Sequence, residues 1–293
     1  MDYPTKTTAA NTFKIGFLLV VAFCALAACI HELPLKEIHY PSAADNTFQP
    51  AMFYAPATPG PKPLIMALHT WSGDYKQTYH NDIAEWAVKN NWAYMHPNFR
   101  GNNNRPEATG SDLVVADILS AVEYAKQNAQ ISSVYLVGTS GGGYTALIMA
   151  GRHPEVWDGV SVWVPIADLE AWYHYSEEYR KDIVKSCGGA PGDSPAVDAE
   201  YRQRSPVTWL ANAREVPLHI NAGIHDETVP PSHSIKAFNT LAHPQERLDE
   251  NWSEPLQVIS GNASLTLFDG GHDLIAESAL EWFQALAGMR PQG

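Results

Sequence analysis

The chain has 293 residues, of which 45% are hydrophobic and 17% are charged, and its formal net charge at pH 7 is −13. A chain of this length can bury most of its apolar surface without covalent cross-links, so it does not need a disulfide framework to fold. Its acidic balance repels nucleic acid and anionic membrane surfaces, and we expect neither of them to be a partner.

The N-terminal residues have the features of an export signal. Lys6 and Lys14 precede an apolar stretch over residues 15–28, which is too short to span a bilayer but has the length of a signal-peptide core. The stretch ends in Leu26-Ala27-Ala28-Cys29. This tetrapeptide resembles the lipobox of bacterial lipoproteins, in which the cysteine is lipidated and becomes the new N-terminus. An ordinary secretory signal and an uncleaved anchor are the alternative interpretations.

Strand and helix patterns then alternate from about Lys62 to Leu286. Continuous apolar runs are typical of strands buried on both faces, and apolar residues at three- and four-residue spacing predict amphipathic helices. We expect strands at residues 47–54, 64–68, 92–96, 134–137, 160–165, 216–223 and 265–268, and helices at 80–90, 111–128, 144–150, 232–241 and 274–286. The alternation predicts the α/β class, with a mainly parallel twisted sheet and helices on both faces.

Two segments interrupt this alternation. Residues 166–213 are rich in Tyr, Trp, Glu and Asp, and they predict a small helical insertion that covers the functional site. Residues 243–263 are polar, and we interpret them as a short helix followed by a loop.

A glycine-rich pentapeptide, Gly138-Thr139-Ser140-Gly141-Gly142, lies between the predicted strand at 134–137 and the helix that follows it. Such a G-x-S-x-G turn presents its serine hydroxyl above the edge of a sheet, and its glycines leave room for the sharp change of chain direction. In this context Ser140 is predicted to be a catalytic nucleophile.

A base and an acid follow Ser140 in the order that triads on this type of sheet require. Asp226 and His272 each come just after a predicted strand, at the edge where open α/β sheets place their chemistry. His272 is the predicted base for the hydroxyl proton, and Asp226 is predicted to orient its imidazole. His225 and His233 are rival bases, and the rival carboxylates are Asp269, Asp273 and Glu227.

A tetrahedral intermediate also needs two N–H donors aimed at its oxyanion. We expect the backbone N–H of Gly141, the residue after the nucleophile, to be the first donor. The second should come from the loop after the strand at 64–68, which reads His69-Thr70-Trp71-Ser72-Gly73. The backbone N–H of Trp71 is the predicted donor, and that of Thr70 is the alternative.

These motifs together resemble the catalytic domain of the prolyl-oligopeptidase family of serine hydrolases. The matching segments lie at residues 97–101, 138–143, 201–206, 216–230 and 270–272. The resemblance implies the α/β-hydrolase fold and serine-type peptidase activity, although small esterases share the same catalytic domain. Thr70 departs from the family's usual glycine in the His-Gly-X-Gly loop. Only about 30 residues separate Cys29 from the first core strand, so we expect no N-terminal β-propeller.

Four further residues are candidates for the substrate pocket: Thr70, Arg100, Tyr144 and Trp172. The chain has no HExxH motif, no Cys-x-x-Cys pair and no phosphate-binding glycine loop, so we expect no metal and no organic cofactor.

The sequence thus predicts a serine hydrolase that cleaves a small ester or a short peptide through an acyl-enzyme. Of these two interpretations, we favour ester or deacylase chemistry. The alternatives are a serine-type peptidase acting on short peptides and a non-catalytic, lipid-anchored binding protein on a hydrolase scaffold. Residues 1–28 are expected to be a lipoprotein signal peptide, 29–46 a tether or first edge strand, and 47–290 one α/β-hydrolase domain. We expect a lipid at Cys29 to be the only membrane contact, and the bacterial cell envelope, at the outer membrane or its periplasmic face, to be the location.

Overall fold

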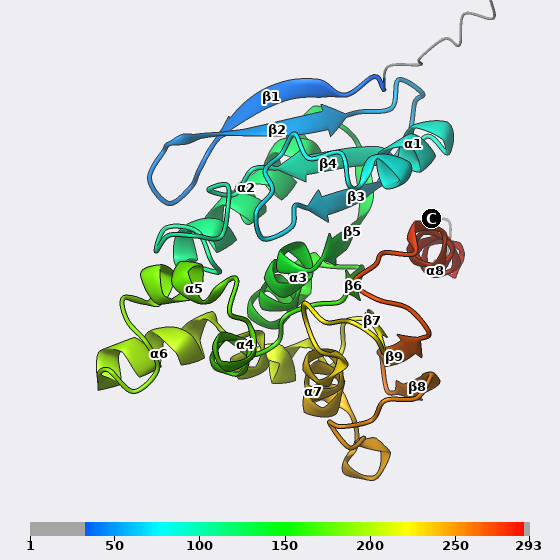
Figure 1. Cartoon of the computed structure of the whole chain (residues 1–293). Helices are drawn as coiled ribbons and strands as arrows, with labels where there is room; N and C mark the ends of the chain where they lie inside the picture. The colour runs from blue at the N-terminus through cyan, green and yellow to red at the C-terminus, as the bar shows by residue number, and fades with distance from the viewer. Residues whose placement is uncertain (1–32, 290–293) are drawn as a thin grey trace, which may run out of the picture. The chain divides into compact units, whose positions relative to one another are not determined.

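The computed structural model of the protein describes residues 33–289, and these contain one nine-stranded sheet. The strands are Lys36–Pro41 (β1), Phe48–Tyr54 (β2), Lys62–Leu68 (β3), Ala93–Pro97 (β4), Ile131–Thr139 (β5), Gly159–Trp163 (β6), Leu218–Gly223 (β7), Leu256–Ser260 (β8) and Ala263–Phe268 (β9). They lie in the order β1-β2-β4-β3-β5-β6-β7-β9-β8. The run from β4 to β9 in this order is parallel, whereas β1, β2 and β8 are antiparallel to their neighbours (Figure 1).

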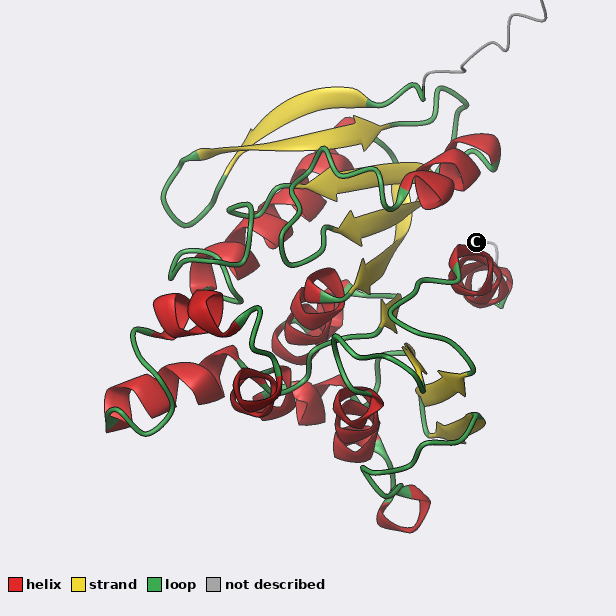
Figure 2. Cartoon of the chain, in the orientation of Figure 1, coloured by secondary structure: helices red, strands yellow, loops and turns green. Residues whose placement is uncertain are grey.

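Helices cover both faces of the sheet, as Figure 2 shows. The α-helices are Asn81–Lys89 (α1), Asp112–Asn128 (α2), Gly141–Arg152 (α3), Leu169–Tyr175 (α4), Arg180–Cys187 (α5), Pro195–Arg204 (α6), Pro231–Leu241 (α7) and Ala276–Gly288 (α8). Short 3₁₀ helices lie at Pro154–Val156 (η1), Pro206–Thr208 (η2), Leu210–Ala213 (η3) and Pro244–Glu246 (η4). The predicted mainly parallel sheet with helices on both faces is therefore confirmed.

The two faces of the sheet bury two separate clusters of side chains because successive residues of a strand point to opposite sides. In β3, Leu64 and Met66 face the cluster that includes residues of α2, α3 and α7, whereas Ile65 and Ala67 face the cluster that includes residues of α1 and α8. All four side chains are fully buried. This explains why the central strands read as continuous apolar runs rather than as alternating ones.

One end of the sheet differs from the sequence expectation. The segment at 243–263, interpreted as a short helix and a loop, also contains strand β8, which pairs antiparallel with β9. This edge strand is only partly buried and therefore lacks the continuous apolar run of the central strands. At the other end of the sheet, residues 36–41 form the edge strand β1, which is the edge-strand alternative expected for the segment before residue 47.

The predicted insertion lies between β6 and β7 and contains α4, α5 and α6. Arg204, at the end of α6, ties it to the loop before α2, because its guanidinium Nη1 donates hydrogen bonds to the carbonyl oxygens of Pro106 and Thr109, each at 3.0 Å. The Tyr144 hydroxyl donates to the Arg204 carbonyl oxygen at 2.8 Å, which joins the same point to α3. The insertion is thus attached firmly to the helix that follows the serine turn.

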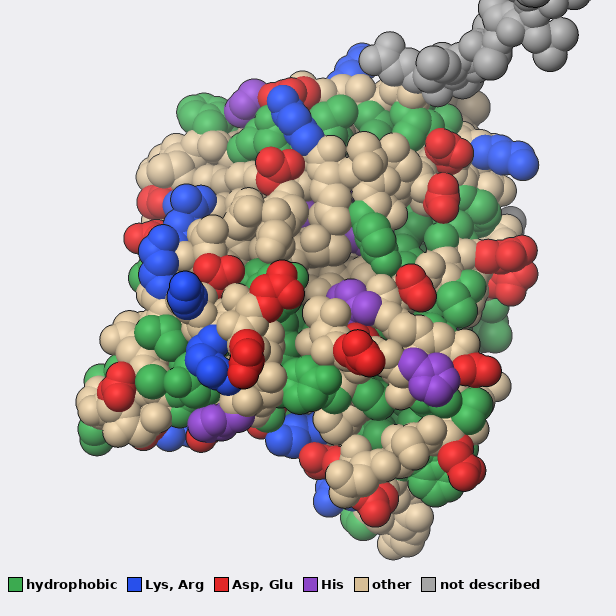
Figure 3. All heavy atoms as spheres, viewed as in Figure 1, with side chains coloured by type: hydrophobic (Ala, Val, Ile, Leu, Met, Phe, Trp, Pro, Cys, Tyr) green, Lys and Arg blue, Asp and Glu red, His purple; other side chains and the backbone are tan. Residues whose placement is uncertain are grey.

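The face of the molecule shown in Figure 3 carries acidic side chains across its breadth; one group of Lys and Arg side chains lies near its left edge, and others lie at its top, right and bottom. Within residues 33–289, no helix combines the length and the apolar character needed to cross a bilayer. The predicted signal peptide and the lipidation site at Cys29 lie outside the described residues.

Candidate active site

The turn from β5 into α3 holds Ser140 in an unusual backbone conformation. Its φ and ψ are 56° and −119°, a region that residues with a side chain rarely adopt. The Ser140 N–H donates to the Trp163 carbonyl oxygen at 2.9 Å, which fixes the turn against β6. A Cβ at Gly138 would overlap the carbonyl oxygen of Gly142, and one at Gly142 would overlap that of Leu68. The glycines are therefore required by the close approach of three backbone segments, as expected for a nucleophile turn.

Asp226 and His272 meet at the carboxyl ends of β7 and β9. A Cβ at Gly223 would overlap the carbonyl oxygens of Gly270 and Gly271, so the two loops pack backbone against backbone. His272 Nδ1 lies 2.7 Å from Asp226 Oδ2. Because a carboxylate only accepts hydrogen bonds, Nδ1 carries the proton and Nε2 is left free to act as a base.

The Asp226 carboxylate is held at both of its oxygens. The backbone N–H groups of Thr228 and Val229 donate to Oδ1 at 2.8 and 2.9 Å, which leaves Oδ2 for His272. Asp226 is only 5% exposed, and hydrogen bonds from backbone N–H groups stabilise such a buried carboxylate. Within residues 33–289, it is the only carboxylate hydrogen-bonded to the ring of His272.

The rival bases and acids lie in other arrangements. His225 Nε2 lies 2.9 Å from Asp269 Oδ1, and both side chains are exposed. His233 is buried, and its Nδ1 accepts a hydrogen bond from the Ala167 N–H at 3.2 Å. Burial lowers the pKa of His233 to about 4. Neither histidine lines the cavity that contains Ser140.

Ser140 and His272 line the same cavity, which has a volume of about 270 Å³. No hydrogen bond joins the Ser140 hydroxyl to His272 in the part of the chain that the structure describes. Hydrogen bonds between a nucleophile and its base are often long in the absence of substrate and tighten when it binds. The structure thus places the nucleophile and the histidine of the Asp–His pair at one cavity.

The backbone of Trp71 lies directly against Gly141. A Cβ at Gly141 would come within 2.5 Å of the Trp71 Cα, so the two N–H groups predicted to form the oxyanion hole are neighbours. Gly141 is the first residue of α3, where the N–H has no partner within the helix. The Thr70 N–H instead donates to Gln77 Oε1 at 2.9 Å. Because the Thr70 N–H is already used, the geometry favours Trp71 over Thr70 as the second donor.

The cavity wall combines aromatic rings with small polar side chains. It is lined by Thr70, Trp71, Ser72, Gln77, Tyr79, Thr139, Ser140, Tyr179, Thr228 and His272. The side chains of this wall include no carboxylate, no ammonium and no guanidinium group. Of the four residues predicted for the substrate pocket, only Thr70 lies in this wall.

The structure corrects the other three assignments to the pocket. Arg100 is an anchor of its loop, because its guanidinium pairs with Asp117 at 2.7 Å and with Asp45 at 2.8 Å. Tyr144 is fully buried and points to the Arg204 carbonyl oxygen. Trp172 is also fully buried and packs against the ring of Trp71 rather than lining the cavity.

Gln77, Tyr79, Tyr179 and Thr228 are lining residues that sequence reasoning missed. Gln77 and Tyr79 lie in the segment between β3 and α1, and Thr228 lies shortly after β7. Their position after the carboxyl ends of strands is the signal that could have identified them. Tyr179 lies between α4 and α5, where no strand end indicates the site.

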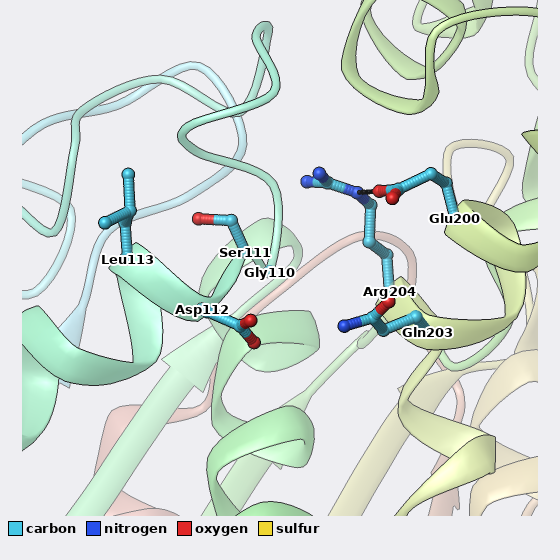
Figure 4. Close-up of a pocket in the computed structure, with 7 residues that line it drawn as sticks. All are labelled: Gly110, Ser111, Asp112, Leu113, Glu200, Gln203 and Arg204. Atoms are coloured by element: carbon cyan, nitrogen blue, oxygen red, sulfur yellow. Dashed lines mark hydrogen bonds and ion pairs between the residues drawn. The ribbon is translucent and has the colours of Figure 1, made fainter. Parts of the chain in front are cut away.

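A second cavity, of about 240 Å³, lies between the start of α2 and α6 (Figure 4). Its Ser111 hydroxyl caps α2 by accepting from the Val114 N–H, and it also donates to the Glu107 carbonyl oxygen. Arg204 Nε pairs with Glu200 at 2.7 Å, drawn as the dashed line. No histidine lines this cavity, so it offers Ser111 no base of that kind.

Within residues 33–289, no group of three or more His, Cys, Asp and Glu side chains is arranged to hold a metal ion. Cys187 is a buried free cysteine, and burial raises the pKa of its thiol to about 12. It therefore stays protonated near neutral pH and is not a reactive thiolate.

The nucleophile turn and the Asp226–His272 pair lie at the carboxyl edge of a mainly parallel sheet, and together they define a serine hydrolase with the α/β-hydrolase fold. Comparison with known families narrows this class. The model of the prolyl oligopeptidase family matches residues 78–254, which is more than half of the chain. The chain therefore belongs to the prolyl oligopeptidase family. A search of curated proteins found no match.

Solved structures of peptidases share the fold. A prolyl endopeptidase superposes with a TM-score of 0.66 at 20% identity over 87% of this chain and 38% of its own. A puromycin-hydrolyzing peptidase from Mycobacterium tuberculosis gives 0.64 at 16% identity, over 88% and 40%. The acylaminoacyl peptidase of Pyrococcus horikoshii gives 0.57 at 16% identity, over 71% and 34%. The chain thus spans well under half the length of each of these proteins.

Proposed function

We propose that the protein hydrolyses a carboxylic ester or amide through an acyl-enzyme formed on Ser140. His272 Nε2 takes the hydroxyl proton as Ser140 Oγ attacks the carbonyl carbon, and it then donates this proton to the leaving group. The N–H groups of Gly141 and Trp71 bind the oxyanion. Water then releases the acyl group with the help of the same base. The observation that carries the proposal is the 2.7 Å pair of His272 and Asp226 beside the cavity that contains Ser140.

The substrate class follows from the cavity and from the family. Membership in the prolyl oligopeptidase family favours a peptide bond. The cavity holds about 270 Å³ and offers no carboxylate to a free amino-terminus and no guanidinium to a free carboxylate. We therefore propose a small acyl donor that is uncharged near its scissile carbonyl, namely a small ester or an N-blocked short peptide. Esters should turn over faster because their leaving groups depart more easily.

A matched panel of substrates tests this assignment. We expect the protein to cleave p-nitrophenyl acyl esters and N-acetylated aminoacyl p-nitroanilides, and to cleave the same anilides with a free amino group more slowly. Ser140→Ala should abolish both activities. Ser132→Ala is the matched control, because Ser132 is exposed on the same strand β5. Turnover confined to substrates with a free amino-terminus would contradict the neutral substrate class.

A non-catalytic binding protein on a hydrolase scaffold is the alternative. It would share the fold and the cavity, and it accounts for the absence of a hydrogen bond between Ser140 and His272 in the described residues. It predicts that fluorophosphonate probes leave Ser140 unmodified, whereas the hydrolase predicts covalent labelling.

We also propose that Cys29 carries a lipid and holds the protein at the bacterial cell envelope. The support is the apolar leader and the lipobox-like tetrapeptide that ends in Cys29. Cells fed an alkyne fatty acid should yield labelled wild-type protein and unlabelled Cys29→Ala protein. Cys24→Ala is the matched control, because Cys24 lies within the predicted leader. Equal labelling of the wild-type protein and the Cys29→Ala variant would contradict the anchor.

A further inference from the structure

Trp172, in helix α4 of the insertion, contacts both halves of the proposed catalytic machinery although it does not line the cavity. We propose that Trp172 is a positioning residue: it fixes the loop that contains Asp226 and the loop that contains Trp71 relative to each other. This inference rests on the proposed function.

The first contact is a hydrogen-bonded path to the triad. The indole Nε1 of Trp172 donates to the Thr228 carbonyl oxygen at 3.0 Å. The Thr228 N–H donates to Asp226 Oδ1 at 2.8 Å, and Asp226 Oδ2 pairs with His272 at 2.7 Å. Trp172 therefore fixes the backbone segment that determines which carboxylate oxygen faces the imidazole.

The second contact is with the oxyanion loop. The rings of Trp172 and Trp71 pack edge to face, with centroids 4.7 Å apart and an interplanar angle of 71°. The Trp71 indole N–H is buried and has no hydrogen-bond partner in the described part of the chain. The position of the Trp71 side chain thus depends on packing, and Trp172 is the closest of the aromatic rings that contact it. Moving Trp172 would therefore move the residue whose backbone N–H we assign to the oxyanion hole.

Helix α4 is itself anchored on the loops that it positions. The Tyr175 hydroxyl donates to the Glu227 carbonyl oxygen at 3.0 Å, next to the bond made by Trp172. At the other end of the helix, the Asp168 side chain caps α4 and pairs with Lys236 of α7 at 2.9 Å. Trp172 is fully buried between these anchors, so its ring has one defined position.

Trp172→Phe tests the proposal because it keeps an aromatic ring and removes the indole N–H. Trp157→Phe is the matched control: Trp157 is buried, its Nε1 donates to the Met149 carbonyl oxygen at 3.2 Å, and it does not line the cavity. With a p-nitrophenyl ester as the substrate, we expect Trp172→Phe to lower kcat at least about 10-fold and to change KM by less than about twofold, because small displacements of catalytic groups slow the chemical step. Trp157→Phe should leave both constants near their wild-type values.

The possible results separate this inference from the proposed function. An inert wild-type protein would overturn both. If the wild-type protein is active and Trp172→Phe has the same kcat as the control Trp157→Phe, only the positioning role is overturned. A raised KM with unchanged kcat would also overturn it, since that result indicates direct contact with the substrate. Should Trp172→Phe fail to fold, Tyr175→Phe removes the neighbouring bond from an exposed residue. We then expect a smaller loss of kcat with unchanged KM, and an unchanged kcat would contradict the proposal.

Discussion

The substitution Asp226→Asn tests the orientation of the imidazole directly. Two backbone N–H groups, those of Thr228 and Val229, point at Oδ1. An asparagine must therefore place its amide oxygen there, and its NH₂ group then faces His272 Nδ1. This arrangement forces Nδ1 to accept a hydrogen bond and puts the ring proton on Nε2, where the base must be free. His272 in this tautomer cannot take the proton from Ser140.

We expect kcat to fall by about 10⁴, which corresponds to about 5 kcal/mol of lost transition-state stabilisation. KM and the far-UV circular dichroism spectrum should change little, because the amide has the shape of the carboxylate and still accepts the hydrogen bonds from the two backbone N–H groups. Steady-state kinetics with a p-nitrophenyl ester, together with the rate of fluorophosphonate labelling, measure the effect. A kcat within 10-fold of the wild-type value would refute the assignment of Asp226 as the residue that orients His272. The assignment of the protein to the serine hydrolases would be unaffected.

Two further substitutions and one labelling experiment test other parts of the account. Gly141→Ala places a methyl group against the Trp71 backbone, 2.5 Å from its Cα, and we expect kcat to fall about 10²–10³-fold; a loss below threefold would contradict the oxyanion assignment. Burial lowers the pKa of His80 from its ordinary value of 6.5 to about 3, so below pH 6.5 the unfolded chain binds a proton that the folded chain does not. The free energy of unfolding is therefore unaffected by His80 above pH 6.5 and is lowered by about 2 kcal/mol at pH 5. Urea unfolding at pH 8 and at pH 5 should show a smaller difference in this free energy for His80→Gln than for the wild-type protein. Equal differences in the two proteins would refute the role of His80. The Cys187 thiol, with its pKa raised to about 12 by burial, should resist iodoacetamide at pH 8 in the folded protein and react in urea; fast reaction in the folded protein would show that it is accessible.

Much of the fold could be predicted from the sequence because the central strands are buried on both faces. A run such as 64–68 is apolar throughout, and it marks its strand without reference to the rest of the chain. Strand β8 gives no such signal, because an antiparallel edge strand buries only part of its surface and takes its register from β9. The sequence pattern therefore weakens where one face of the sheet is exposed.

The triad could be assigned from sequence because each of its members follows a strand in a recognisable order. The residues that line the pocket could not be assigned from sequence, because the direction of a side chain depends on loops that meet only in the folded chain. Arg100 follows β4, yet the carboxylates of Asp45 and Asp117 draw it away from the cavity. Trp172 was predicted to line the pocket, but it is fully buried and packs against the ring of Trp71 instead. In both residues, contacts with segments that are distant in the sequence determine where the side chain lies.

Covalent labelling of Ser140 tests the central claim most directly. The wild-type protein would be treated with a fluorophosphonate, digested and analysed by mass spectrometry. We predict a single adduct on the peptide that contains Ser140, and no adduct in Ser140→Ala. An unmodified Ser140 in folded protein, or labelling that persists in Ser140→Ala, would contradict the account.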